Sequence, residues 1–218
     1  MTPDNPEKED MAQTTVSANA VKELRDRTGA GFMDCKRALE DAGGNVDQAV
    51  ALLKERGMAS AARKSEREAR EGTIASYIHP GGRLGVLMEV NSETDFVARN
   101  EEFQKLVRDL AMQVAGMAPT YVSVDSIPAE VVEAKRAELM AEPDVQAKPE
   151  NVRGQIVDGK LRKWYQGVGG VLYEQPFRDS DQTVGDLVTD AVARIGENIV
   201  VRRFMRYQLG EDQSGEQA

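Results

Sequence analysis

The sequence predicts an α+β fold, with a small N-terminal domain of three helices followed by a core domain in which helices pack on a short antiparallel sheet. Two observations predict this arrangement. From residue 17 to residue 56, apolar residues recur three and four positions apart, which is the spacing of amphipathic helices. From residue 73 to residue 91 they alternate with other residues, which is the spacing of half-buried strands. A chain of 218 residues is long enough for one or two domains.

The first region contains three short helices with turn residues between them. The second helix carries its apolar stripe from Cys35 to Ala42, and Gly43 follows where a helix commonly ends. Asn45 can cap the third helix, because its side chain accepts hydrogen bonds from the first helical turn. We expect Gly57 to end that helix. Because Cys35 lies on the apolar stripe, we expect a small core residue and not a nucleophile.

An exposed connecting helix is expected over residues 57–72, because basic and acidic residues alternate there with little apolar periodicity. Strands follow this helix. The strands are expected at residues 73–79 and 83–91, joined by a Pro-Gly-Gly turn. A last strand at residues 199–209 is expected to join the same sheet.

Further helices are expected to complete the core domain. One begins near Asn100, and two begin near Pro128 and Pro149, where a proline in the first turn is tolerated. The last begins with a capping box at Thr183 and ends at Gly196.

These boundaries divide the chain into five parts. They are a disordered leader at residues 1–13, the three-helix domain at 14–56, the connecting helix at 57–72, the core domain at 73–210 and a polar tail at 211–218. The leader is acidic and has no apolar stretch, so it is not a signal peptide, and Met11 is an alternative start.

Composition argues against several classes of function. The chain has 28 basic and 37 acidic residues, and this balance disfavours a broad nucleic-acid surface because phosphates require clustered Lys and Arg. No run approaches the roughly 20 apolar residues that span a bilayer, so we expect no membrane segment. The single cysteine, Cys35, and the single histidine, His79, cannot form a His- or Cys-rich zinc site. Pairs of carboxylates stay open as an acid–base site, because the sequence does not show which of the 37 acidic residues converge. No constellation in the sequence supports an enzyme, and we expect no metal or cofactor.

The pair Asp95-Phe96 is the most informative local feature, because it places a large aromatic residue in a polar turn between a strand and a helix. Two interpretations are open. Phe96 either packs into the local core, as a staple for the helix beginning near Asn100, or stands exposed as an aromatic anchor of the kind that dominates binding hot spots. The sequence pattern by itself does not decide between the buried and the exposed interpretation.

Two long motifs and three shorter ones resemble the translation elongation factor Ts family, and they follow the family's order from about residue 14 to residue 210. The long motifs are residues 21–39 (VKELRDRTGAGFMDCKRAL) and 93–100 (ETDFVARN); the shorter ones are 174–177 (EQPF), 183–185 (TVG) and 195–204 (IGENIVVRRF). The length resembles the short form of the family, which lacks the second core subdomain of longer members.

This resemblance implies a guanine-nucleotide exchange factor for elongation factor Tu, acting in the cytoplasm during protein synthesis. The three-helix domain of the family is similar to ubiquitin-associated domains and binds the GTPase domain of the partner. By the same resemblance, the residues that line this contact are Arg25, Phe32, Met33 and Lys36.

The resemblance also implies that Thr94, Asp95, Phe96 and Val97 form the exchange wedge. Phe96 enters an apolar pocket between helices of the partner. Asp95 helps to disturb the groups that hold Mg²⁺ near the phosphates of bound GDP. The partner is then bound in its GDP-loaded and its nucleotide-free states.

Some positions depart from the family pattern. Phe32 stands where Met is common, and it is still large and apolar. Ser92 replaces a common Cys, and Gly169-Gly170 replaces bulkier residues. Met205 stands where some short members have a cysteine that links two subunits, so a covalent dimer through this position is excluded and a homodimer stays open.

A second hypothesis comes from a different class: a binding adaptor whose ubiquitin-associated-like helices hold some other protein partner. It explains residues 17–56, but it gives Asp95-Phe96 and the C-terminal half no role.

Overall fold

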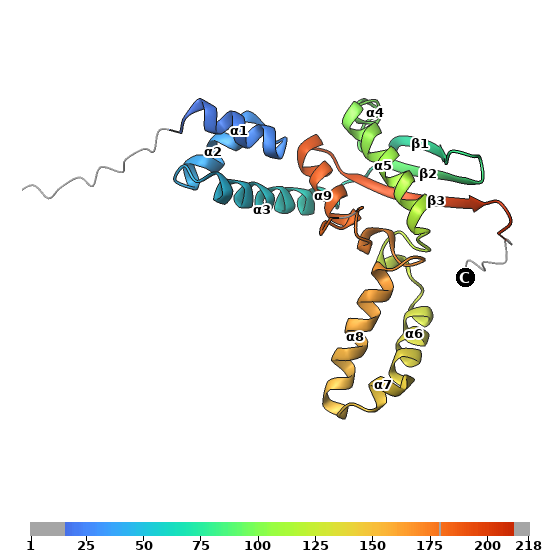
Figure 1. The fold of residues 1–218 in the computed structure, drawn as a ribbon. Coiled ribbons are helices and arrows are strands. Elements are labelled where there is room, and N and C mark those ends of the chain that lie inside the picture. Colours follow the sequence, from blue (N-terminus) through green and yellow to red (C-terminus); the bar gives the residue numbers. More distant parts are fainter. Residues whose placement is uncertain (1–15, 179, 212–218) are drawn as a thin grey trace, which may run out of the picture. The chain divides into compact units, whose positions relative to one another are not determined.

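The computed structural model describes residues 16–178 and 180–211 (Figure 1). The chain divides into two compact units, one ending at Ser60 and the other starting at Ala61. The first unit is helical, and the second combines helices with a three-stranded antiparallel sheet, which confirms the predicted α+β fold. The predicted leader at residues 1–13, and residues 212–218 of the predicted tail, lie outside the described residues.

Three helices build the first unit: α1 (Ala18–Thr28), α2 (Phe32–Asp41) and most of α3 (Val46–Lys64). Asn45 precedes α3 and accepts a hydrogen bond from the backbone N–H of Gln48 at 3.0 Å, so it caps the helix as predicted. The apolar faces of the helices form one cluster, and its buried members are Val21, Leu24, Cys35, Ala38, Leu39, Ala42 and Ala49. The prediction that Cys35 is a core residue is therefore confirmed.

The prediction that Gly57 ends the third helix is wrong, because α3 continues through this residue to Lys64. A glycine inside a helix costs only about 1 kcal/mol relative to alanine. The alanines and long charged residues that follow are good helix formers and outweigh that cost. The predicted connecting helix over residues 57–72 is therefore wrong as a separate element, because residues 57–64 extend α3 and residues 65–70 are not helical. The first strand, β1 (Glu71–Ile78), follows directly.

The sheet of the second unit has the strand order β1–β2–β3, with β2 (Leu84–Ser92) in the centre and β3 (Ile199–Gln208) on its other side. Both pairings are antiparallel, and the β2–β3 register ends with the pair Ser92↔Ile199. A bulge interrupts that register beside Val201. The buried hydroxyl of Tyr173 accepts the N–H of Val201 at 3.0 Å, and burial raises the pKa of the Tyr173 phenol.

One face of the sheet forms the main core. Val86, Met88 and Val90 alternate along β2 and are buried, as the sequence pattern predicts. Helix α5 (Glu101–Met117) contacts all three strands, and α9 (Val184–Ile195) packs against α5. The predicted helix signals are confirmed, because Asn100 caps α5, Thr183 forms a capping box and Gly196 ends α9 with a left-handed backbone.

Between α5 and α9 the chain forms a helical hairpin with a small core of its own. Helices α6 (Ala129–Ala141) and α8 (Glu150–Gln166) run side by side and are joined through the short α7 (Pro143–Gln146) (Figure 1). The buried residues of the hairpin are Leu139, Val145, Val157 and Leu161. Lys160 binds the carboxylates of Asp144 and Glu142, and these hydrogen bonds raise the pKa of Lys160.

The glycine pair after α8 allows a tight return of the chain. A Cβ atom at Gly170 would lie 2.3 Å from the carbonyl oxygen of Tyr165, so a side chain there requires backbone movement. The carbonyl of Gly170 accepts N–H bonds from Thr120 and Tyr121, which ties the return to the segment after α5 and before the short helix η1 (Val124–Ser126). A second short helix, η2 (Leu172–Glu174), follows and packs against α9.

Candidate functional site

A one-turn helix follows the central strand and carries the predicted wedge residues. This helix, α4 (Asp95–Ala98), starts directly after Thr94, whose hydroxyl accepts a hydrogen bond from the N–H of Val97 at 3.4 Å. The carbonyl of Thr94 accepts hydrogen bonds from Ala98 N–H and from the hydroxyl of Ser92. The polar turn expected from the sequence is thus a capped helical turn with a defined conformation.

Phe96 projects from α4 into solvent, and 78% of its surface is exposed. The two residues that follow Phe96 face the interior: Val97 packs against the main core, and Ala98 is buried in it. The interpretation of Phe96 as a core staple is therefore wrong, and the interpretation as an exposed aromatic residue is the one that the structure supports. The buried side of the turn anchors the helix, which leaves Phe96 free for a contact outside the chain.

Asp95 lies beside Phe96, and its carboxylate is about half exposed. It forms an i,i+4 ion pair with Arg99 at 2.5 Å. Exposed pairs of this kind contribute only about 0–1 kcal/mol to stability. The carboxylate of Asp95 can therefore exchange Arg99 for another partner at little cost to the fold.

Two carboxylates cross between the turn and the segment before β3. Glu197 accepts both polar hydrogens of Thr94, the N–H at 3.0 Å and the O–H at 2.7 Å. In the other direction, Glu93 accepts the N–H of Asn198 at 2.7 Å. The side-chain amide of Asn198 donates to the carbonyl of Arg67 at 2.7 Å, which adds a link to the segment after α3.

This network was not predictable from local sequence, because 103 residues separate Thr94 from Glu197. Glu197 and Asn198 lie within the motif at residues 195–204, which contributed to the family resemblance but suggested no role for either residue. The strand register brings these residues together, and no local periodicity encodes that register.

The predicted partner-binding residues lie on the first unit. Phe32 and Met33 begin α2 and are 51% and 57% exposed. Lys36 follows one turn later on the same helix and pairs with Glu40 at 3.7 Å, while Arg25 is exposed on α1. Two adjacent large apolar side chains that remain exposed beside a well-formed core are typical of a binding surface.

Within residues 16–178 and 180–211, no three His, Cys, Asp or Glu side chains come together as metal ligands would. His79 is exposed, and its ring nitrogen lies 2.9 Å from the hydroxyl of Tyr77. No helix in the same ranges is long and apolar enough to cross a membrane.

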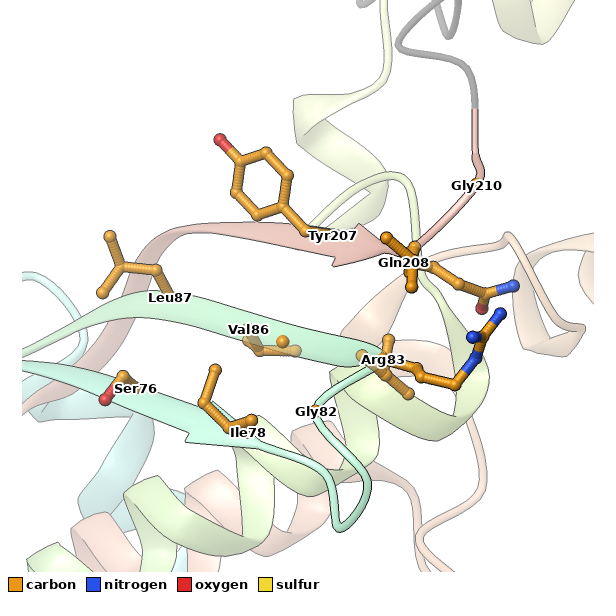
Figure 2. Close-up of a pocket in the computed structure, with 12 residues that line it drawn as sticks. Ser76, Ile78, Gly82, Arg83, Val86, Leu87, Tyr207, Gln208 and Gly210 are labelled. Carbon is orange, nitrogen blue, oxygen red and sulfur yellow. The ribbon is translucent and has the colours of Figure 1, made fainter.

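An apolar groove of about 580 Å³ lies on the face of the sheet that α5 does not cover. Ile78, Leu87 and Tyr207 come from three different strands and project along this groove (Figure 2). The register places Gly85 between Ile78 and Tyr207, so the missing side chain forms part of the hollow. All three of the projecting side chains are at least half exposed.

A model of the family described as Elongation factor TS matches residues 9–211. The chain belongs to the elongation factor Ts family. The match covers both α4 and the exposed start of α2, and it confirms the resemblance seen in the motifs. Membership of this family supports a role as a translation elongation factor.

Three relatives illustrate the similarity, and each is named Elongation factor Ts. The protein from Synechococcus sp. (strain JA-2-3B'a(2-13)) is 54% identical over 199 residues, which cover 90% of this chain and 76% of the relative. The protein from Carboxydothermus hydrogenoformans is 50% identical over 197 residues, covering 90% of each chain. The protein from Coprothermobacter proteolyticus is also 50% identical over 197 residues, covering 90% of this chain and 99% of the relative.

The exposure of Phe96 predicts that Phe96→Ala changes the free energy of unfolding by no more than about 0.5 kcal/mol, because surface residues away from caps and core contribute little. The matched control is Phe103→Ala, since Phe103 is fully buried on α5, and its loss should cost about 3–5 kcal/mol. Urea-induced unfolding measures both variants. A loss of about 2 kcal/mol or more for Phe96→Ala would show that this side chain is packed in solution.

Proposed function

We propose that this chain is a guanine-nucleotide exchange factor for elongation factor Tu, acting in the cytoplasm during translation elongation. The observation that carries the proposal is an exposed Phe96 on an anchored turn, in a chain of the elongation factor Ts family. Nucleotide exchange requires that the chain bind the nucleotide-free partner more tightly than the GDP-bound partner. It requires no catalytic acid, base or nucleophile. The chain therefore acts as a binding protein and not as an enzyme.

Phe96 and Asp95 have different roles in this proposal. Phe96 enters an apolar pocket of the GDP-bound partner, and burial of its aromatic ring stabilises the state of the partner from which GDP leaves. Asp95 exchanges its pair with Arg99 for contacts near the groups that hold the partner's Mg²⁺. Because that ion is the largest positive charge beside the phosphates, its displacement weakens GDP binding. Coupling is reciprocal, so nucleotide binding in turn weakens the complex, and the nucleotide-free partner is bound most tightly.

The first unit supplies affinity. Phe32 and Met33 form the exposed apolar part of its surface, and Lys36 and Arg25 add positive charge. We assign this surface to the GTPase domain of the partner. It lies on a different unit from α4, which predicts that affinity and the exchange step can be separated by mutation.

A homodimer is also proposed, through the exposed face of the sheet. Besides Ile78, Leu87 and Tyr207, this face carries Met205, which pairs in register with Leu87. The family resemblance aligns Met205 with the position at which some short members carry a cysteine that joins two subunits. A second copy covers these apolar side chains, and the thioether of Met205 packs where the cysteine would otherwise link the chains.

The division of roles predicts two distinct effects on GDP release from elongation factor Tu. Phe96→Ala lowers the maximal rate at saturating concentration of this chain, because the wedge is lost. Met33→Ala raises the concentration needed for half-maximal rate and leaves the maximum within about twofold, because only affinity is lost. Release of a fluorescent GDP analogue, followed over a range of concentrations, measures both quantities.

Failure of the wild-type chain to accelerate release at any concentration would reject the exchange function. In that case saturable binding of ubiquitin by the same chain would favour the adaptor hypothesis.

The role of Asp95 predicts a dependence on Mg²⁺. Asp95→Asn removes the negative charge with little change in shape, and it should slow stimulated release several-fold when Mg²⁺ is present. The difference from wild type should shrink after chelation, because the ion to be displaced is then absent. The comparison uses the same release assay with and without EDTA. An equal loss under both conditions would contradict the assigned role.

The homodimer predicts a solution mass of about twice 23.9 kDa at micromolar concentration, measured by sedimentation equilibrium. Leu87→Glu places a charge in the centre of the face and should yield the monomer mass. The control is Val168→Glu, since Val168 is equally apolar and 73% exposed but does not lie on the sheet. A monomeric wild-type chain at 100 μM would overturn this assignment.

A further inference from the structure

Thr94, the residue that opens α4, uses each of its polar groups in a hydrogen bond. Its N–H and O–H both donate to Glu197, and its carbonyl accepts the N–H of Ala98. Its hydroxyl oxygen also accepts the N–H of Val97. Because the hydroxyl hydrogen points to Glu197, the lone pairs are left for Val97, so the same side chain connects the carboxylate to the first turn of the helix.

Glu197 binds Thr94 through both of its oxygens, Oε2 to the N–H at 3.0 Å and Oε1 to the hydroxyl at 2.7 Å. Two bonds to a planar carboxylate fix direction as well as position, and hydrogen bonds to a charged acceptor are stronger than neutral ones. Glu197 therefore determines the orientation in which the chain enters α4.

Glu197 is itself held on a rigid base. It follows Gly196, the left-handed residue that ends α9, and it precedes the first residues of β3. The next residue, Asn198, is buried and donates its N–H to Glu93 and its side-chain amide to the carbonyls of Ser65 and Arg67. The carboxylate is thus positioned by a helix end, a strand start and a buried amide.

The hydrogen bonds from Thr94 to Glu197 are important for α4, because this helix has only four residues and an isolated turn of helix is unstable in water. Phe96 is too exposed to hold the turn by its own packing. A disordered turn would have to be ordered when the partner binds, and that ordering would reduce the binding energy available for exchange.

We propose that Glu197 is a positioning residue for exchange, which acts through Thr94 to hold α4 and present Phe96 in its binding orientation. This inference rests on the proposed exchange function and extends it to a residue in a distant part of the chain.

The test measures maximal stimulated GDP release and unfolding for Glu197→Ala, Glu197→Gln and a control. Glu197→Ala should lower the maximal rate about tenfold, the equivalent of about 1.4 kcal/mol. Glu197→Gln should recover most of the rate, because its amide oxygen can accept the Thr94 N–H while its NH₂ group donates to the hydroxyl. The control is Asp109→Asn, which alters another partly buried carboxylate of the same unit, paired with Arg178 at 2.5 Å, and should leave the rate unchanged.

A double-mutant cycle separates positioning from general stability. In a Phe96→Ala background, Glu197→Ala should change the rate by less than about twofold, since no wedge remains to be positioned. All rates are taken at a temperature where unfolding curves show every variant folded. If Glu197→Ala unfolds there, Glu197→Asp replaces it, because the shorter carboxylate cannot reach both donors.

The outcomes distinguish the two proposals. No acceleration by the wild-type chain rejects the exchange function itself. Acceleration that depends on Phe96 but is unchanged in Glu197→Ala rejects only the positioning role. The same is true of a tenfold loss that persists undiminished in the Phe96→Ala background.

Discussion

The last pair of the β2–β3 register, Ser92 with Ile199, is the constraint on which the rest of the site depends. In an antiparallel pair, the residues that leave one strand must lie beside the residues that enter the other. Residues 93–94 are therefore brought next to 197–198, and two glutamates cross between the segments: Glu197 accepts the backbone N–H of Thr94, and Glu93 accepts the backbone N–H of Asn198. The chain turns into α4 from this junction. A slip of the register by one residue would remove the crossing and reorient Phe96.

Much of this architecture could be predicted from local sequence patterns, because strand burial and helix capping depend on residues that are close together in the sequence. The alternation in β2 predicted which side chains are buried, and Asn45, Asn100 and Thr183 predicted helix starts through their capping side chains. Gly57 misled because a single glycine is a weak signal against a run of good helix formers. The sequence did not reveal the core of the α6–α8 hairpin either, since its buried residues meet only after the chain has reversed.

The site itself was only partly predictable. The family motifs identified Thr94 and Phe96, but burial could not be decided from a lone aromatic residue in a polar turn. Exposure follows from a three-dimensional fact: Val97 and Ala98 occupy the core side of α4, so Phe96 must face outward. Glu197 was beyond reach for a different reason, because its role depends on a strand pairing that spans more than 100 residues.

In the proposed exchange mechanism, the shape and the charge that act on the partner are already present before the partner binds. The acidic chain contributes a carboxylate at Asp95 and an apolar anchor at Phe96. Both lie on a helical turn that is capped by a residue of the chain itself. Because the turn is ordered when the chain folds, the free-energy cost of ordering it does not reduce the free energy of binding to the partner.

The proposed entry of Phe96 into the partner is tested most directly by ¹⁹F NMR. With fluorophenylalanine at the five phenylalanine positions, each signal is assigned by single substitution. On addition of GDP-bound elongation factor Tu, the Phe96 signal should shift or broaden, together with that of Phe32, while buried Phe103 stays unchanged. A Phe96 signal that remains in place while Phe32 reports full binding would show that Phe96 does not enter the partner.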